Sequence, residues 1–519
     1  MGLATLDIVV VVAYAIGIFG LAQWVSRDKG GEKKDTGDYF LASKSLPWWA
    51  IGASLIAANI SAEQIVGMSG SGYAIGLAIA SYEWMAAISL LIVGKYFLPI
   101  FLRNEIYSMP QFLERRYGPS IRTLMAVFWL GLYIFVNLTS IIWLGSIAVH
   151  QVAGVDQDIA LVALGLFALL YQIRGGLKAV ALTDIVQVTL LVFGGLVVSG
   201  LTLSQIGGES GILGGFVELT RRVPEKFDMI LSPDNPYYKD LPGIAVLIGG
   251  MWIVNLSYWG FNQYIIQRAL AAKSLKEAQK GIVFAAYLKL LMPVIIVLPG
   301  IAAVMLAPDL VRPDEAYPTM MRLLPTGLLG LVFAALIAAV IASTASKVNS
   351  IATIFTLDLY NQRGKQHDER HLVMVGRIAA TVATLLAILT ARPLLGSFDQ
   401  AFQFIQEYTG FFTPGIFVIF MLGLFWKGAS EAGALAAAIG SFILSLVVKV
   451  GWPEFPFINR MGVVFVCALI IAVVVSRLRP ARAGADMIRT DVDFATSTGF
   501  NIGGVGVIAI LVALYTIWW

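Results

Sequence analysis

Long apolar runs separated by short clusters of charged residues fill most of the chain. A helix that crosses the hydrocarbon core of a bilayer needs roughly 20 mostly apolar residues, and about fourteen runs reach that length. The expected spans are residues 5–25, 48–73, 76–101, 121–150, 157–173, 178–204, 242–268, 274–307, 324–358, 372–391, 397–426, 430–450, 459–476 and 499–518. The pattern therefore predicts an all-α polytopic membrane protein.

Basic residues gather in every second connector between these spans. If the connector after the first span is cytoplasmic, the cytoplasmic connectors hold about two thirds of the lysine and arginine residues, and positive charge stays on that side during insertion. We therefore expect both termini on the external side. The longest external connector, residues 205–241, carries charges of both signs, and we expect it to form a structured loop or lid.

Two clusters of polar residues interrupt otherwise apolar spans. The first runs from Asn59 to Gln64 in the second span, and the other from Asn255 to Gln263 in the seventh. Unwound helix centres expose backbone carbonyls and helix-end dipoles that suit cations and polar ligands, and inverted repeats place such interruptions in matching helices. The two interrupted spans are five apart. This spacing favours two five-helix halves within one transporter domain over residues 1–519. The halves are residues 48–204 and 242–426, with additional helices at 5–25 and 430–518.

Composition supports the membrane assignment. Hydrophobic residues make up 58% of the chain and charged residues only 13%, with a mean hydropathy of +0.81. Soluble domains carry about 25% charged residues. The net charge of +4 gives no indication of a nucleic-acid partner. The single cysteine, Cys467, excludes an intrachain disulfide and a thiolate metal site. The first residues lack a basic region, so we expect no cleavable signal peptide.

Among the ionisable side chains inside the expected spans, five are candidates for a functional role: Glu63, Glu83, Asp184, Lys289 and Lys347. Such residues cost a few kcal/mol each to insert and usually face a cavity or a partner. Glu63 lies within the first interruption, which favours a substrate site over a polar network between helices. Lys289 lies too deep to snorkel, so it should pair with a carboxylate or a polyol. Glu83 also fits an interfacial position, Asp184 a helix cap, and Lys347 a snorkelling one.

Hydroxyl groups and aromatic rings add to this picture. Ser343, Thr344 and Ser346 offer three hydroxyls to a hard cation such as Na⁺, although close helix packing through small residues explains the same pattern. Aromatic residues near the polar clusters are candidates to stack on the apolar face of a sugar ring. They are Tyr82, Tyr258, Trp259, Phe402 and Phe404.

Other classes of protein receive less support. The three histidines, His150, His367 and His371, are too scattered for a metal site. The sequence contains no P-loop, so an ATP-driven pump is unsupported. An intramembrane enzyme using Glu63 and Glu83 remains an alternative, but the sequence offers no donor site for it. We therefore expect a transporter and not an enzyme.

Several sequence signatures then point to a known family. They are Asp38-Tyr39-Phe40-Leu41-Ala42 with Lys44-Ser45-Leu46-Pro47-Trp48-Trp49, Ala57 through Gln64, Tyr82-Glu83-Trp84, Arg174-Gly175-Gly176 through Thr183-Asp184 and Gln187, Trp259-Gly260 to Gln267-Arg268, Asn349-Ser350 to Thr356, Asp358 and Tyr360, and Gln403 to Gly410. With these motifs the chain resembles the sodium:solute symporter family, and within it the bacterial sodium/glucose (galactose) cotransporters.

The resemblance implies a fold and a function. The fold is an inverted five-plus-five helix repeat (LeuT-like) with discontinuous helices. The function is symport of Na⁺ and a hexose by alternating access, in the inner membrane of a bacterium. The expected partners are thus the hexose, Na⁺ as the transported coupling ion, and the lipid bilayer.

The resemblance also assigns roles to individual residues. The residues implied to bind the sugar are Asn59, Ser61, Glu63, Gln64, Tyr82, Glu83, Asn255, Tyr258, Lys289 and Gln406. Tyr258 is implied to stack under the ring as the inner gate, and Met68 and Phe402 to close the site from outside. The residues implied to hold Na⁺ are Ala57, Ile60 and Ala339, through backbone carbonyls, and Ser343, through its hydroxyl. Asp184 matches a carboxylate on the cation exit path.

Three positions depart from the family pattern. Ala342 stands where close relatives have a second serine at the Na⁺ site, unless Thr344 or water replaces it. Lys347 follows Ser343 by four residues and so lies on the same helical face. Ala86 stands where relatives have serine beside the sugar. These departures keep open a proton-coupled or uncoupled transporter of the same fold, or a symporter of another small polar solute.

Overall fold

The computed structural model describes residues 2–26, 47–104, 106, 109–174, 177–361, 368–481 and 492–519. Within these ranges the regular secondary structure is helical, and no strand is present. The first part of the family signature, residues 38–46, and the Gly175-Gly176 pair lie outside the described residues.

The helices follow one another with short connections. In the N-terminal part they are α1 (Thr5–Ser26), α3 (Trp48–Asn59), the π-helix η2 (Glu63–Met68), α4 (Ser69–Ala74), the 3-10 helix η3 (Leu77–Ala80), α5 (Ser81–Ile92), the π-helix η4 (Val93–Phe97), α6 (Leu98–Arg103), α7 (Met109–Tyr117), α8 (Pro119–Leu132), the π-helix η5 (Tyr133–Leu138), α9 (Thr139–Ala153) and α10 (Gln157–Arg174).

The middle part contains the longest helices. Its elements are α11 (Leu177–Gly207), η6 (Gly208–Ser210), α12 (Gly211–Arg222), η7 (Pro224–Lys226), α13 (Ala245–Ile248), α14 (Gly250–Phe261), α15 (Gln263–Leu270), α16 (Leu275–Leu306), the 3-10 helix η8 (Pro313–Glu315), α17 (Ala316–Met321), α18 (Leu328–Thr353) and the π-helix η9 (Ile354–Tyr360). The C-terminal part holds α19 (Glu369–Leu395), α20 (Ala401–Thr409), α21 (Thr413–Phe425), α22 (Glu431–Gly451), α23 (Phe457–Leu478) and α24 (Thr498–Ile517).

Each expected span coincides with one of these helices or with a chain of them. In the described part, nine helices are long and apolar enough to cross a membrane, or up to eleven if each of two bent pairs is one span. The bent pairs are α3 with the helix that starts at Glu63, at 70°, and α20 with α21, at 46°. The all-α membrane class is thus confirmed. The count of fourteen spans and the inverted repeat stay predictions.

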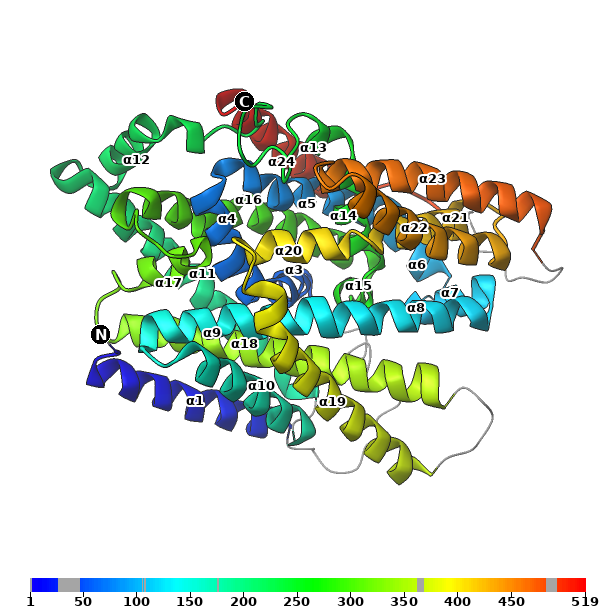
Figure 1. Ribbon diagram of the computed structural model, residues 1–519, viewed down its shortest axis with the longest axis horizontal. Coiled ribbons are helices and arrows are strands. Elements are labelled where there is room, and N and C mark those ends of the chain that lie inside the picture. Colours follow the sequence, from blue (N-terminus) through cyan, green and yellow to red (C-terminus); the bar gives the residue numbers. More distant parts are fainter. Residues whose placement is uncertain are drawn as a thin grey trace.

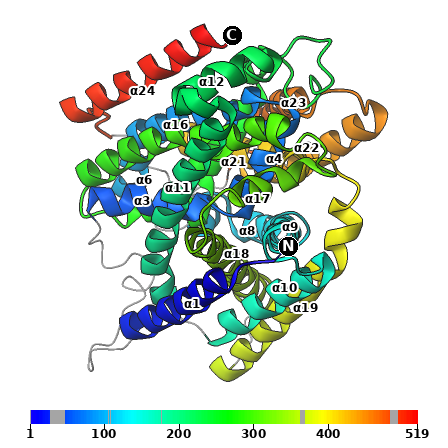
Figure 2. The same ribbon diagram turned by 90° about the vertical axis from the view of Figure 1, so that its left-hand side faces the viewer.

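The long helices lie side by side, with both termini toward the end of the bundle that carries α12 and α17 (Figure 1). Viewed from that end, α1 and α24 occupy opposite edges (Figure 2). Near the C-terminus, the Met229 N–H donates to the Trp518 carbonyl at 2.8 Å, which ties α24 to the loop after α12. We call this end the terminal face.

The first polar interruption breaks a helix, as predicted. α3 ends at Asn59, and Ile60 is extended, with φ −74° and ψ 116°. The chain restarts as η2 after Ser61, whose hydroxyl accepts a hydrogen bond from the Glu63 N–H at 3.2 Å. This bond satisfies one of the backbone donors that a new helix leaves free.

The second interruption breaks in the same way. α14 ends at Phe261, and Asn262 is extended, with φ −78° and ψ 115°. The Asn262 side chain caps α15 by accepting from the Tyr264 N–H at 3.3 Å. Both predicted interruptions are therefore single extended residues between two helices, and each leaves backbone carbonyls outside the regular helical pattern.

Candidate functional site

Both helix breaks line one cavity inside the bundle, which has a volume of about 180 Å³. Elements far apart in the sequence supply its walls: the α3–η2 break, α5, α8 with η5, α14 with α15, α16, α18, and α20 with α21. Most of the predicted site residues line it. They are Ala57, Asn59, Ile60, Ser61, Glu63, Gln64, Tyr82, Glu83, Asn255, Tyr258, Lys289, Ala339, Ser343, Phe402 and Gln406.

Met68 and Phe404, which were also predicted, do not line the cavity. Met68 is fully buried beside Tyr82 and is absent from the cavity wall. Asp184 falls within α11, but its side chain lies outside the described residues.

A chain of polar contacts crosses the cavity wall at its centre. Lys289 on α16 donates to Glu83 Oε2 on α5 at 2.6 Å and also to Asn59 Oδ1 at the end of α3. Asn59 in turn donates to the Tyr258 hydroxyl at 3.2 Å, and the Lys289 ammonium lies 5.0 Å from the centre of the Trp259 ring. The expected partner of Lys289 is therefore a carboxylate, Glu83.

Glu63 reaches the cavity from the first turn of η2. Its Oε2 accepts a hydrogen bond from the Ser61 hydroxyl at 3.3 Å, whereas Oε1 has no hydrogen-bond partner among the described residues. Gln64 is the next residue and lines the same wall. The restart of the broken helix thus presents two adjacent polar side chains to the cavity.

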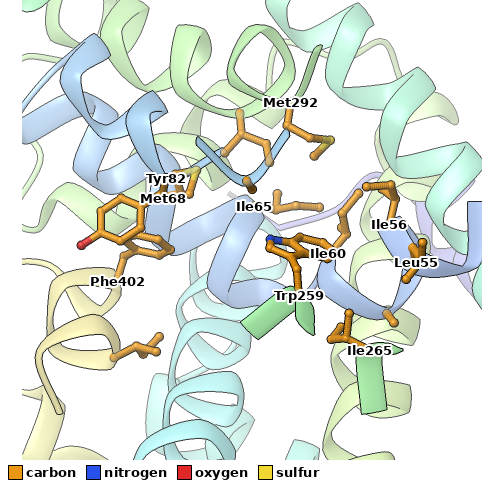
Figure 3. Packing of buried hydrophobic residues seen from close by; sticks show 14 of the residues in the cluster. Leu55, Ile56, Ile60, Ile65, Met68, Tyr82, Trp259, Ile265, Met292 and Phe402 are labelled. Atoms are coloured by element: carbon orange, nitrogen blue, oxygen red, sulfur yellow. The ribbon is translucent and has the colours of Figure 1, made fainter. Parts of the chain in front are cut away.

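Two aromatic rings from different helices line the cavity together. Phe402 on α20 meets Tyr82 on α5 edge to face, with ring centroids 5.1 Å apart and planes at 88°. Figure 3 shows Met68 beside this pair. Phe404, another predicted stacking residue, does not line the cavity, and its ring packs against Phe398 and Tyr408. We call the Phe402–Tyr82 pair the aromatic gate.

The opposite part of the cavity combines small residues with one lysine. Ala339, Ala342 and Ser343 line the cavity from α18, and Ala57 and Ile60 line it from the α3 break. The Lys347 ammonium lies 4.6 Å from the centre of the Tyr133 ring and 4.7 Å from that of Tyr264. Lys347 is thus held between two aromatic faces that stabilise a cation.

Thr344, the alternative to the serine absent at Ala342, lies away from the cavity wall. Its side chain is buried, its hydroxyl donates to the Val340 carbonyl at 2.7 Å, and it is absent from the cavity wall. Ala342 itself lines the cavity with a methyl group.

Several polar residues of the wall received no role in the sequence analysis, although three of them belong to the family signatures. Asn137 lies in the π-helix η5, Gln187 in α11, Arg268 in α15 and Thr409 at the end of α20. Asn137 is a polar side chain in an apolar span, a signal that could have been followed. Arg268 lies in the last turn of α15, where a basic residue is common and does not indicate a site.

Comparisons with known proteins agree on one family. A family model described as Sodium:solute symporter family matches residues 39–440. The Sodium/glucose cotransporter of Vibrio parahaemolyticus is 50% identical over 539 residues, covering 100% of this chain and 99% of that protein. The Sodium/myo-inositol cotransporter 2 of Homo sapiens is 34% identical over 475 residues, covering 86% of this chain and 70% of that protein.

Solved structures show which fold the chain shares. A Na⁺-coupled sialic acid symporter in a substrate-bound outward-open state matches with a TM-score of 0.76 and 22% identity, covering 92% of this chain and 99% of that one. The inward-facing conformation of Mhp1 matches with a TM-score of 0.54 and 14% identity, covering 88% and 97%. At these identities the likeness concerns the fold alone.

Proposed function

The chain belongs to the sodium:solute symporter family, and from that premise we propose that it couples Na⁺ influx to the uptake of a hexose by alternating access. It is a multi-pass membrane protein. The proposal places it in the inner membrane of a bacterium, with the terminal face outside.

The observation that carries the proposal is that one broken helix lines a single cavity with two kinds of ligand. Ala57 and Ile60, at the end of α3, line the same cavity as Ser343 on α18. Glu63 and Gln64 bring polar side chains to the wall beyond the break. A ligand at either part of the cavity would therefore act on the same break.

For the sugar, we propose the polar residues that line the central cavity. Hydroxyl groups of a hexose would exchange hydrogen bonds with Glu63, Gln64, Asn255 and Gln406, and with the Lys289–Glu83 pair. The remaining contacts would come from Asn59, Ser61, Tyr82 and Tyr258. A site built from hydrogen-bonding groups discriminates strongly, because an analogue that lacks one hydroxyl leaves a buried group unpaired.

For Na⁺, we propose the carbonyls of Ala57, Ile60 and Ala339 with the Ser343 hydroxyl. A cation held between α3 and α18 favours the conformation in which these two helices are close. Na⁺ can drive the cycle only if its affinity differs between the two conformations. Asp184 stays a proposed residue of the exit path.

Two alternatives have specific support. The relative named for myo-inositol favours another polyol as the solute. Lys347, held near the proposed Na⁺ ligands by Tyr133 and Tyr264, favours proton coupling. An enzyme receives no support from a family of symporters.

Uptake into proteoliposomes tests the function. We expect radiolabelled glucose or galactose to accumulate against its gradient when Na⁺ is imposed outside, and not when only a proton gradient is imposed. Labelled myo-inositol tests the other polyol. Accumulation driven by protons alone would contradict Na⁺ coupling, and equilibration without accumulation would indicate an uncoupled transporter.

A pair of serine and alanine variants tests the cation site. Ser343→Ala should raise the Na⁺ concentration for half-maximal uptake on the order of tenfold, since a hydrogen-bonding group beside a charge contributes about 1.5 kcal/mol or more. Ala342→Ser should lower that concentration, because it adds a hydroxyl to the same wall. Hexose affinity measured at saturating Na⁺ should change little in both. An unchanged Na⁺ dependence in both variants would remove this wall from the cation site.

A further inference from the structure

Three elements, η8, α20 and α4, meet at the buried side chain of Asp314, next to the start of the helix that carries Phe402. Asp314 lies in the 3-10 helix η8, is 2% exposed, and accepts a hydrogen bond through Oδ2 from the Ala401 N–H at 3.0 Å. Ala401 is the first residue of α20, directly before the gate residue Phe402. The Asp314 side chain therefore holds the start of the helix that carries the gate.

The third element is α4, which approaches Asp314 with a glycine. A Cβ added to Gly70 would lie 2.4 Å from Asp314 Oδ1 and 2.8 Å from its Cα, so α4 packs here without room for a side chain. One turn away, the Tyr73 hydroxyl donates to the Pro308 carbonyl at 2.7 Å. The loop around η8 is thus wedged between the outer part of the broken helix and the start of α20.

The charges around Asp314 only partly offset its burial. Arg312, Glu315 and Asp399 are the charged groups that act on it, and Tyr73 faces the same loop from α4. Burial raises the pKa of Asp314 to about 7, although the Ala401 N–H and Arg312 favour its anion, while Glu315 and Asp399 disfavour it. The Arg312 guanidinium itself lies over the Trp143 ring on α9 at 5.1 Å.

In the opening motion that we infer, Phe402 and the start of α20 move away from η8. Asp314 would then meet water, where an aspartate has a pKa of about 4. A group that binds its proton more tightly in one state favours that state as the pH falls. Protonation of Asp314 therefore favours the closed gate, and ionisation favours the open one.

We propose that Asp314 is a proton-operated latch that positions Phe402: the neutral side chain seats α20 against η8 and α4, and the carboxylate releases it. The inference rests on the proposed function only in treating the aromatic gate as the external entrance. Its test needs neither a hexose nor an ion gradient, so failed uptake and a failed latch are distinguishable.

The test measures access to the cavity in the full chain with Cys467→Ser. One protein carries a single cysteine at Ala86, in the cavity wall, and another at Leu213, which is 83% exposed on α12. Both are treated with a membrane-impermeant maleimide in sealed vesicles whose orientation makes Leu213→Cys reactive. The ratio of the two labelling rates removes the pH dependence that the two thiols share, and the Asp314→Asn comparison removes the rest.

We expect the labelling rate of Ala86→Cys, divided by that of Leu213→Cys, to rise about tenfold between pH 6 and pH 8. A rise of this size follows when Asp314 has a pKa near 7 in the closed state only. Asp314→Asn, which keeps an acceptor for the Ala401 N–H without the charge, should hold the ratio at its pH 6 value. Asp309→Asn makes the same change at an exposed position of the same loop and should keep the rise.

Either of two results overturns the latch. One is a ratio that stays constant from pH 6 to pH 8 with Asp314 in place, which can be measured without any variant of that residue. The other is a rise that persists in Asp314→Asn. If that variant fails to insert, Asp314→Thr offers a neutral acceptor of another shape for the same comparison.

Discussion

Lys289 and Glu83 form an ion pair deep in the bundle, with side chains 1% and 3% exposed. Taking two charges out of water costs several kcal/mol, which their attraction offsets only when the geometry is good. Removing one partner is much worse than removing both, because it leaves a buried charge uncompensated. The pair therefore links the stability of the bundle to the proposed sugar site.

Lys289→Met should lower the free energy of unfolding by about 3–5 kcal/mol, because it leaves Glu83 unpaired. Adding Glu83→Gln should restore most of that loss. Both proteins should lose hexose binding, measured with labelled sugar in detergent. Lys95→Met, at a partly exposed position, should change stability by about 0.5 kcal/mol or less. Full stability in Lys289→Met would show that Glu83 is not left charged, and retained binding would remove Lys289 from the sugar site.

The sequence identified most of the cavity residues but not the contacts between them. That Lys289 pairs with a carboxylate or a polyol follows from the cost of a buried charge. That its partner is Glu83, 206 positions away, depends on how α16 packs on α5. Likewise, Phe402 and Phe404 are two positions apart and so point to different sides of α20, and only Phe402 reaches the cavity. The packing of α20 against its neighbours decides which of the two rings reaches the cavity.

At the scale of elements, Arg116 joins α7 to the end of α21. Its guanidinium donates to the carbonyls of Gly423 at 3.2 Å, Ala429 at 3.0 Å and Trp426 at 3.0 Å, and Arg116 is buried. These carbonyls lie at and beyond the C-terminal turn of α21, where backbone acceptors lack helical partners and a positive charge is favourable. A lysine ammonium lacks the planar, widely spaced N–H groups that reach these three carbonyls.

Arg116→Lys should therefore destabilise the protein by about 2 kcal/mol or more, since it leaves buried carbonyls without donors. Thermal unfolding in detergent measures the effect. The adjacent Arg115 is exposed, so Arg115→Lys is a matched control that should leave the midpoint unchanged. Equal midpoints for the two variants would mean that Arg116 does not hold α21 in place.

Both helix breaks were predictable because each requires polar residues inside an apolar span. Ile60 and Asn262 are the extended residues that result. The π-helices were not predicted. In η5, which brings Tyr133 and Asn137 to the cavity, the wider turn reflects packing with neighbouring helices, and no residue type marks it in advance.

At the scale of the whole molecule, the hydrophobic pattern predicted the helical class and the position of every expected span. It could not decide how many of those helices cross the bilayer. The range expected at 242–268 is divided among α13, α14 and α15, none of which is long enough to cross alone. The length and hydropathy rule assumes one continuous helix across the bilayer. It does not apply to this range, because the helix is broken at Gly249 and Asn262.

Two exposed leucines can decide the orientation and whether the number of crossings between them is odd or even. Leu213 on α12 is 83% exposed, and Leu478 at the end of α23 is 76% exposed. An odd number of expected spans separates them, so they should lie on opposite sides of the membrane. In Cys467→Ser cells, a membrane-impermeant maleimide should label Leu213→Cys directly, and Leu478→Cys only after permeabilisation, because basic connectors stay inside. The reversed pattern would invert the topology. Labelling of both residues in intact cells would require an even number of crossings between them, and the broken α13–α15 chain would then be the first candidate for a segment that does not cross.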